Sequence, residues 1–165
     1  MSLRGRPRYS SRARCQARVR EGRKPVWICS DWTAAEAAVG RARSAAEEVG
    51  DVTGIANSRL ARAELDRKQG RYAEAEAELS AALSGFSEVG DRGGRARVLH
   101  LQGTLENQQG RSDRAQAAYE ESLALRRDLG DDAGVAAMLT NLALVAEHVG
   151  DLDRAEVLGQ EGLAR

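Results

Sequence analysis

The sequence predicts an all-α protein, a right-handed α-solenoid of antiparallel helix pairs, and two observations lead to that prediction. The first is composition, because the 165 residues are rich in Ala, Arg, Glu and Leu but hold only six aromatic residues and two prolines. Such a composition favours helices over a sandwich or a barrel. The second is a pair of turn signals that recurs every 40 residues, which indicates two helices in each repeat.

The first turn signal is the tetrapeptide Glu-Val-Gly-Asp at residues 48–51. It recurs at residues 88–91 and, as Asp-Leu-Gly-Asp, at residues 128–131. A glycine after the last helical turn enters the left-handed conformation without a Cβ penalty, and the following Asp can cap the next helix. We therefore expect one helix to end and another to begin at each of these three joins.

The second turn signal lies about half a period away from the first. It reads Gln-Gly-Arg at residues 69–71 and 109–111 and Val-Gly-Asp at residues 149–151, each followed by an apolar-face alanine at Ala75, Ala115 or Ala155. Between the turns, apolar residues follow the three-and-four spacing of a helix with one buried stripe. The expected stripes are Tyr72, Ala75, Leu79, Ala82, Leu83, Phe86 and Val89; Ala115, Tyr119, Leu123 and Leu129; and Val135, Leu139, Leu142, Val145, Ala146 and Val149.

Charge divides the chain into two parts. Residues 1–30 carry a net charge of +8 and the remainder carries −8. A segment with high like charge and few apolar residues cannot offset its ordering entropy, so we expect a disordered basic arm. The predicted organisation is an arm at residues 1–30 and a repeat array at 31–165, with a half-repeat at 31–50 and repeats at 51–90, 91–130 and 131–165.

Both ends of the predicted array are irregular. The half-repeat led by Trp32 lacks a partner helix with an apolar period upstream, and the last helix is short when compared with its predecessors. Since solenoids need polar terminal faces, we expect these uncapped ends to self-associate. Whether the chain is complete or part of a longer regulator stays open.

The residues Asn141-Leu142-Ala143-Leu144, followed by Gly150, Leu152 and Ala155, resemble the tetratricopeptide repeat family. The resemblance covers about residues 31–165 and departs from the family in its 40-residue period, where 34 is usual, and in a Gly-Asp join in place of Pro. This long variety is similar to repeats of bacterial signalling ATPases and large transcriptional regulators. The resemblance implies a non-catalytic scaffold that binds a partner peptide or helix in a concave groove lined by the first helix of each pair.

The groove residues that the resemblance implies come from three first helices. They are Asn57, Leu60, Glu64, Arg97, His100, Thr104, Thr140, Asn141 and Leu144. Leu60 and Glu64 occupy two places of the Lys/Asn set with which such repeats clamp chaperone C-terminal carboxylates, so a chaperone-tail partner is disfavoured. Two alternatives stay open: a regulatory or oligomerising fragment of a larger ATPase or transcriptional regulator, and a nucleic-acid contact through the basic arm.

No constellation in the sequence indicates catalysis, a cofactor or a metal. His100 and His148 are 48 residues apart, eight more than the period, and Cys15 and Cys29 lack a second ligand pair. No apolar run approaches the roughly 18 to 20 residues that span a bilayer, and no secretory signal is present. With only two cysteines the chain fits a reducing, cytoplasmic setting. We therefore expect a protein or peptide partner, with no enzyme activity and no membrane association.

Overall fold

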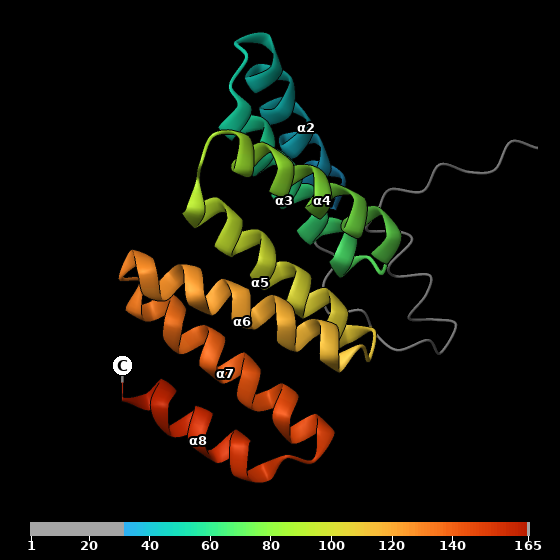
Figure 1. Cartoon of the computed structure of the whole chain (residues 1–165). Coiled ribbons are helices and arrows are strands. Elements are labelled where there is room, and N and C mark those ends of the chain that lie inside the picture. Colours follow the sequence, from blue (N-terminus) through green and yellow to red (C-terminus); the bar gives the residue numbers. More distant parts are fainter. Residues whose placement is uncertain (1–31, 165) are drawn as a thin grey trace, which may run out of the picture. The chain divides into compact units, whose positions relative to one another are not determined.

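The computed structural model describes residues 32–164, which form seven α-helices joined by short turns (Figure 1). The helices are α2 (Trp32–Glu48), α3 (Val52–Lys68), α4 (Tyr72–Glu88), α5 (Arg92–Gln108), α6 (Ser112–Leu129), α7 (Asp132–Val149) and α8 (Leu152–Leu163). The chain divides before Val39, and its second unit, from Val39 onward, contains α3–α8 and most of α2. The predicted basic arm lies outside the described residues. The fold is the all-α solenoid of antiparallel helix pairs that the sequence predicts.

Six glycines end the helices α2 to α7. Gly50, Gly70, Gly90, Gly110, Gly130 and Gly150 are 20 residues apart and have positive φ angles between +67° and +83°. In each turn the residue after the glycine donates its backbone N–H to a carbonyl five residues earlier, as from Asp51 to Ala46 at 2.9 Å and from Arg71 to Asp66 at 2.8 Å. This pattern satisfies carbonyls at the helix end and makes each turn a Schellman motif.

The two kinds of turn begin the next helix differently. Asp91 accepts a hydrogen bond from the backbone N–H of Gly94 at 2.7 Å, and Asp51, Asp131 and Asp151 make the same type of cap. Arg71 and Arg111 make no such cap. Their guanidinium groups instead pair with the carboxylates of Asp66 and Glu106 in the preceding helix. Both carboxylates are buried, so each ion pair fastens the second helix of a pair to the end of the first.

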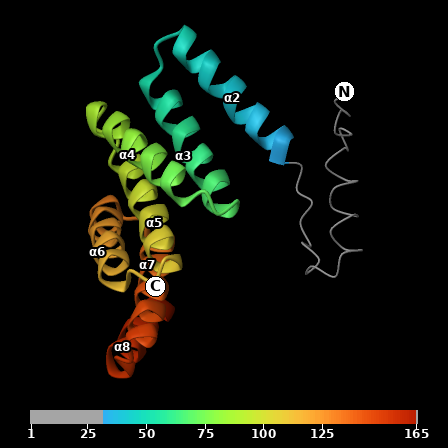
Figure 2. The same ribbon diagram turned by 90° about the vertical axis from the view of Figure 1, so that its right-hand side faces the viewer.

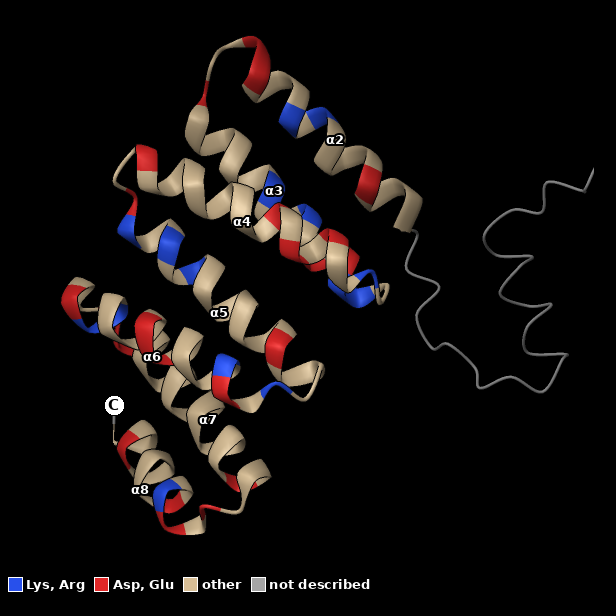
Figure 3. Cartoon of the chain, turned by 45° about the vertical axis from the view of Figure 1, so that its right-hand side comes forward, with Lys and Arg blue, Asp and Glu red and all other residues tan. Residues whose placement is uncertain are grey.

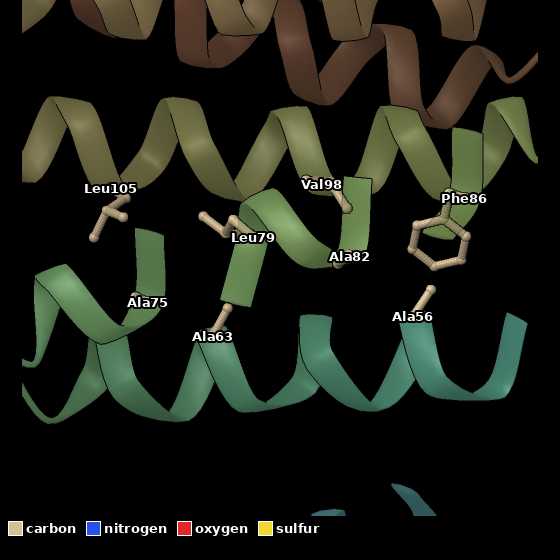
Figure 4. Packing of buried hydrophobic residues seen from close by; sticks show 8 residues of the cluster. All are labelled: Ala56, Ala63, Ala75, Leu79, Ala82, Phe86, Val98 and Leu105. Atoms are coloured by element: carbon tan, nitrogen blue, oxygen red, sulfur yellow. The ribbon is translucent and has the colours of Figure 1, made fainter. Parts of the chain in front are cut away.

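The core lies where a helix pair meets the first helix of the next pair. One cluster joins Ala56 and Ala63 of α3, Val98 and Leu105 of α5, and four residues of α4: Ala75, Leu79, Ala82 and Phe86 (Figure 4). A second cluster joins α6 to α7, the first helix of the next pair, and includes Tyr119, Leu123, Met138 and Leu139. Because every cluster bridges consecutive pairs, each repeat depends on its neighbour for burial of its apolar stripe.

The predicted apolar stripes are too long at their ends. Val89, Leu129 and Val149 are 45%, 47% and 58% exposed, and Tyr72 is 37% exposed; Val49, which follows α2, is 78% exposed. The four aliphatic residues directly precede a left-handed glycine, and Tyr72 is the first residue of its helix. These positions lie at the ends of the helices, beyond the surface that a neighbouring helix covers. In α2, Ala46 is the buried residue.

Hydrogen bonds and ion pairs connect helices of the same kind across repeats. Arg97 of α5 contacts Asn57 of α3, and Asn141 of α7 contacts His100 of α5. On the other side Arg154 of α8 pairs with Glu120 of α6. The first helices α3, α5 and α7 thus form one layer and the second helices α4, α6 and α8 the other, as Figure 2 shows for the second unit. The first layer carries the residues of the expected groove.

Candidate partner-binding groove on the first helices

A groove with a volume of about 520 Å³ lies between α3 and α5. Six of the expected groove residues line it: Asn57, Leu60, Glu64, Arg97, His100 and Thr104. They meet because residues 40 apart occupy the same height on two neighbouring first helices, as Asn57 and Arg97 do. Three further lining residues, Ala61, Arg67 and Leu101, were not expected from the sequence. The side chains on one face of α3 and α5 therefore form a single open surface.

One end of the groove is an ion-pair cluster on α3. Glu64 accepts hydrogen bonds from Arg67 at 2.8 and 3.0 Å and lies 3.0 Å from the ammonium of Lys68. Burial alone would raise the pKa of Glu64, but its bonds to Arg67 and Lys68 outweigh burial and lower it. The carboxylate of Glu64 is thus ionised at neutral pH and compensated within its own helix.

Arg97 is held at the other end of the groove. Its Nη2 donates to the side-chain oxygen of Asn57 at 3.0 Å, and its guanidinium carbon lies 5.4 Å from the centroid of the Phe86 ring. Phe86 itself is fully buried, so the ring is a fixed support for the cation. Within the described residues, Arg97 has no carboxylate within 4.0 Å. Its charge is therefore positioned by neutral groups.

The middle of the groove contains a polar network. The Nε2 atom of His100 lies 3.1 Å from the amide nitrogen of Asn141, and the Tyr119 hydroxyl donates to Oγ1 of Thr104 at 3.2 Å. Thr104 in turn donates to the backbone carbonyl of His100 at 3.0 Å. Burial lowers the pKa of His100, and the charge of Arg126 lowers it further. His100 is therefore neutral at physiological pH.

The three expected residues of α7 lie beyond this groove. Asn141 is half-buried and touches His100, whereas Thr140 and Leu144 are exposed and do not line the cavity. Thr140 donates to the carbonyl of Ala136 at 2.9 Å, and Leu144 is 47% exposed. Apart from Asp132 and Glu147, α7 has no acidic or Lys/Arg side chain along its length (Figure 3). The structure thus brings together the residues of α3 and α5 and leaves all three α7 residues outside the cavity, with Asn141 in contact with His100.

The other candidate sites among the described residues are weaker candidates for binding a partner or a metal ion. A second hollow of about 380 Å³ is lined by Arg43, Arg59 and Arg62, but each of these pairs with a carboxylate: Glu47, Glu78 and Asp66, respectively. Among residues 32–164 no cluster of three or more His, Cys, Asp or Glu side chains could hold a metal ion. None of the helices in this range has the length and apolar character that crossing a membrane requires.

The fold and the groove define a helical repeat protein with an open, mixed polar and apolar surface on its first helices. The tetratricopeptide repeat matches residues 54–128 and 94–165, more than half of the chain, and the chain therefore belongs to the tetratricopeptide repeat family. Proteins of this family typically act as non-catalytic scaffolds that bind other proteins.

A solved structure supports the same fold. The crystal structure of BtubC (BKLC) from P. vanneervenii is similar to this chain with a TM-score of 0.69 and 24% sequence identity. The similarity covers 81% of this chain and 56% of that chain, so this chain spans little more than half of that protein's length. No curated protein matches the sequence.

Proposed function

We propose that this chain is a non-catalytic interaction module whose groove between α3 and α5 receives a peptide or helix of a partner protein. The observation that supports this proposal is the groove itself, whose walls are two helices fixed by core packing and by the contact between Arg97 and Asn57. A site on rigid helices loses little entropy when it is occupied, which favours binding.

The composition of the groove fits a peptide. Leu60 and Leu101 are half-buried and offer apolar surface for an anchoring side chain. Asn57 and Thr104 offer hydrogen-bonding groups to a peptide backbone, and Arg67 and Arg97 offer charged donors. Asn141 and Leu144 of α7 extend the same layer and would contact a longer ligand.

Site-specific photocrosslinking followed by calorimetry tests the proposal. A photoreactive phenylalanine analogue replaces Leu60 in the groove or, as a control, Ala117, which is exposed on the second helix α6. Crosslinks to one partner from position 60 and none from position 117 support the groove. With that partner, Arg97→Ala combined with Asn141→Ala should weaken binding by about 2 kcal/mol or more, while Glu76→Ala and Arg127→Ala on the other layer should not. The reverse pattern would contradict the proposal.

A second candidate role is oligomerisation, either of this chain or within a longer ATPase or transcriptional regulator. One observation favours it: α8 leaves Leu152 67% and Leu163 91% exposed, whereas Leu123, at the place of Leu163 in the preceding repeat, is 6% exposed. A nucleic-acid role would depend on the basic arm, and the net charge of −8 on the rest of the chain opposes it. The low cysteine content supports a cytoplasmic location.

A further inference from the structure

We propose that the groove between α3 and α5 selects a partner segment that carries an aspartate or glutamate, whose carboxylate pairs with Arg97 while a neighbouring apolar side chain contacts Leu60 and Leu101. This inference rests on the proposed function and specifies the chemistry of the partner at the same site.

Arg97 differs from its neighbours on the same helix. Arg92 pairs with Asp128 at 2.5 Å and Arg95 with Glu121 at 3.6 Å, so their charges are compensated within the protein. The guanidinium of Arg97 is exposed and meets one amide oxygen and the face of one aromatic ring. An arginine has five N–H donors, and a bidentate carboxylate is the partner that matches their fork.

The position of Arg97 is fixed before any ligand arrives. The buried Phe86 ring supports one face of the guanidinium, and Asn57 holds one of its nitrogens from the neighbouring helix. Because Arg97 is pre-organised in this way, little side-chain entropy remains to be lost on binding. An unsupported surface arginine would lose more.

The local charge of the groove opposes that of the chain around it. Its charged lining residues are Glu64, Arg67 and Arg97, with Lys68 beside Glu64, while residues 31–165 carry a net charge of −8. Glu64 is already paired with Arg67 and Lys68, so it does not repel an incoming carboxylate as an isolated acid would. His100 adds no charge at neutral pH because burial lowers its pKa. The groove is therefore a small positive site on an acidic body.

The apolar surface of the groove indicates which residue the partner segment carries near its acid. Leu60 and Leu101 are both half-buried groove residues, and Ala61, which follows Leu60 in the sequence and also lines the groove, is exposed. Successive side chains of an extended peptide point to opposite faces, so residues two apart lie on the same face, about 6 to 7 Å from one another. We thus expect an apolar residue two positions from the acid.

A random dodecapeptide library displayed on phage and selected on the full chain provides the probe. Peptides selected by the parent protein should share an Asp or Glu two positions from an apolar residue. Selection on Arg97→Glu should remove that acid and enrich Lys or Arg in its place. Arg114→Gln alters another exposed arginine, on α6, and should leave the selected motif unchanged.

A double-mutant cycle with the strongest synthetic peptide then tests the pairing. We expect Arg97→Gln to weaken binding about tenfold or more, and we expect replacement of the peptide's acid by its amide to weaken binding to the parent equally. The amide peptide should lose nothing further on Arg97→Gln. Circular dichroism melts identify any variant whose fold has changed.

The outcomes separate this inference from the proposed function. Peptides that lose binding on Leu60→Glu but show additive effects in the cycle would overturn the role of Arg97 and leave the groove as the binding site. Peptides that are insensitive to both Leu60→Glu and Arg97→Gln, or a selection that yields no binding peptide, would overturn both. Coupling between Arg97 and the acid, with loss on Leu60→Glu, supports both.

Discussion

The side-chain amide of Asn141 lies 3.1 Å from Nε2 of His100 and connects the first helices of two consecutive repeats. A neutral imidazole accepts this hydrogen bond at Nε2 when its proton is on Nδ1. A protonated imidazole has no acceptor, so the contact with the amide N–H would be lost. The charged groups around His100 are Arg67 and Arg126, which disfavour its protonation, and Glu64, which favours it.

We predict that the stability of the chain falls as the pH drops through the range in which His100 titrates. The pKa of His100 in the folded chain lies below its ordinary value of 6.5, because of burial first and the charge of Arg126 second. At pH values between the folded pKa and the ordinary pKa, the unfolded chain binds more protons than the folded chain. The free energy of unfolding therefore falls as the pH drops below about 6.5. Urea unfolding from about pH 5 to 8 measures this dependence. His100→Gln should flatten it, and an unchanged slope in that variant would contradict the assignment.

Gly103 is predicted to tolerate no larger residue. A Cβ at this position would lie 2.6 Å from ring atoms of Tyr119, and that ring is 2% exposed and fixed in the second core cluster. We expect Gly103→Ala to destabilise the chain by about 1 to 3 kcal/mol, despite the better helix propensity of Ala. Gly159→Ala is the matched control, since a Cβ there meets nothing within 4 Å and should stabilise α8 by up to about 1 kcal/mol. Denaturant unfolding of both variants measures the difference, and equal effects would argue against the close packing of Gly103.

The turns could be predicted from the sequence because their chemistry is local. A glycine with positive φ followed by a capping Asp determines where one helix ends and the next begins without reference to any distant residue, as at Gly90 and Asp91. The burial of Leu105 and Met138, in contrast, depends on which helices meet, and neither residue belonged to an expected stripe. The same reason explains the exposure of Val49 and Val149.

The groove could be predicted in part for a related reason. An exact 40-residue register places Asn57 beside Arg97, and this follows from the repeat alone. The support of Arg97 by Phe86 and the contact between Asn141 and His100 depend on side-chain conformations across helices, which a period does not specify. Leu144 belongs to the same register yet lies outside the cavity, because the cavity is confined to α3 and α5.

The contribution of the Asp91 N-cap to the stability of the chain should be measurable by substitution. The Asp91 carboxylate accepts the backbone N–H of Gly94 at 2.7 Å and satisfies a donor that the helix cannot. We expect Asp91→Ala to cost about 1 kcal/mol and Asp91→Asn to recover most of that, because an amide oxygen also caps. Asp113→Ala serves as the control, since Asp113 is exposed in the first turn of α6 and is not its N-cap residue. Thermal melts compare the three; a loss for Asp91→Asn as large as for Asp91→Ala would show that charge, and not the cap, is responsible.

The last prediction concerns the exposed face of α8. Leu152 and Leu163 are 67% and 91% exposed, and they are eleven positions apart, which is about three helical turns, so the two side chains share one face. Leu123, 40 residues before Leu163, is 6% exposed because it belongs to the cluster that joins α6 to α7. Within the described chain no following helix covers the face of α8 that carries Leu152 and Leu163. We therefore expect two chains to associate through this face.

Sedimentation equilibrium measures this association as a weight-average mass that increases with protein concentration. Burying a leucine stabilises a contact by about 1.5 to 3 kcal/mol, so Leu163→Glu should weaken association at least tenfold and Leu152→Glu with Leu163→Glu should abolish it. Ala73→Glu places the same charge on an exposed position of α4 and should change nothing. A parent chain that stays monomeric at the highest concentration, or a Leu163→Glu variant that associates as strongly as the parent, would show that the apolar face of α8 does not hold two copies together.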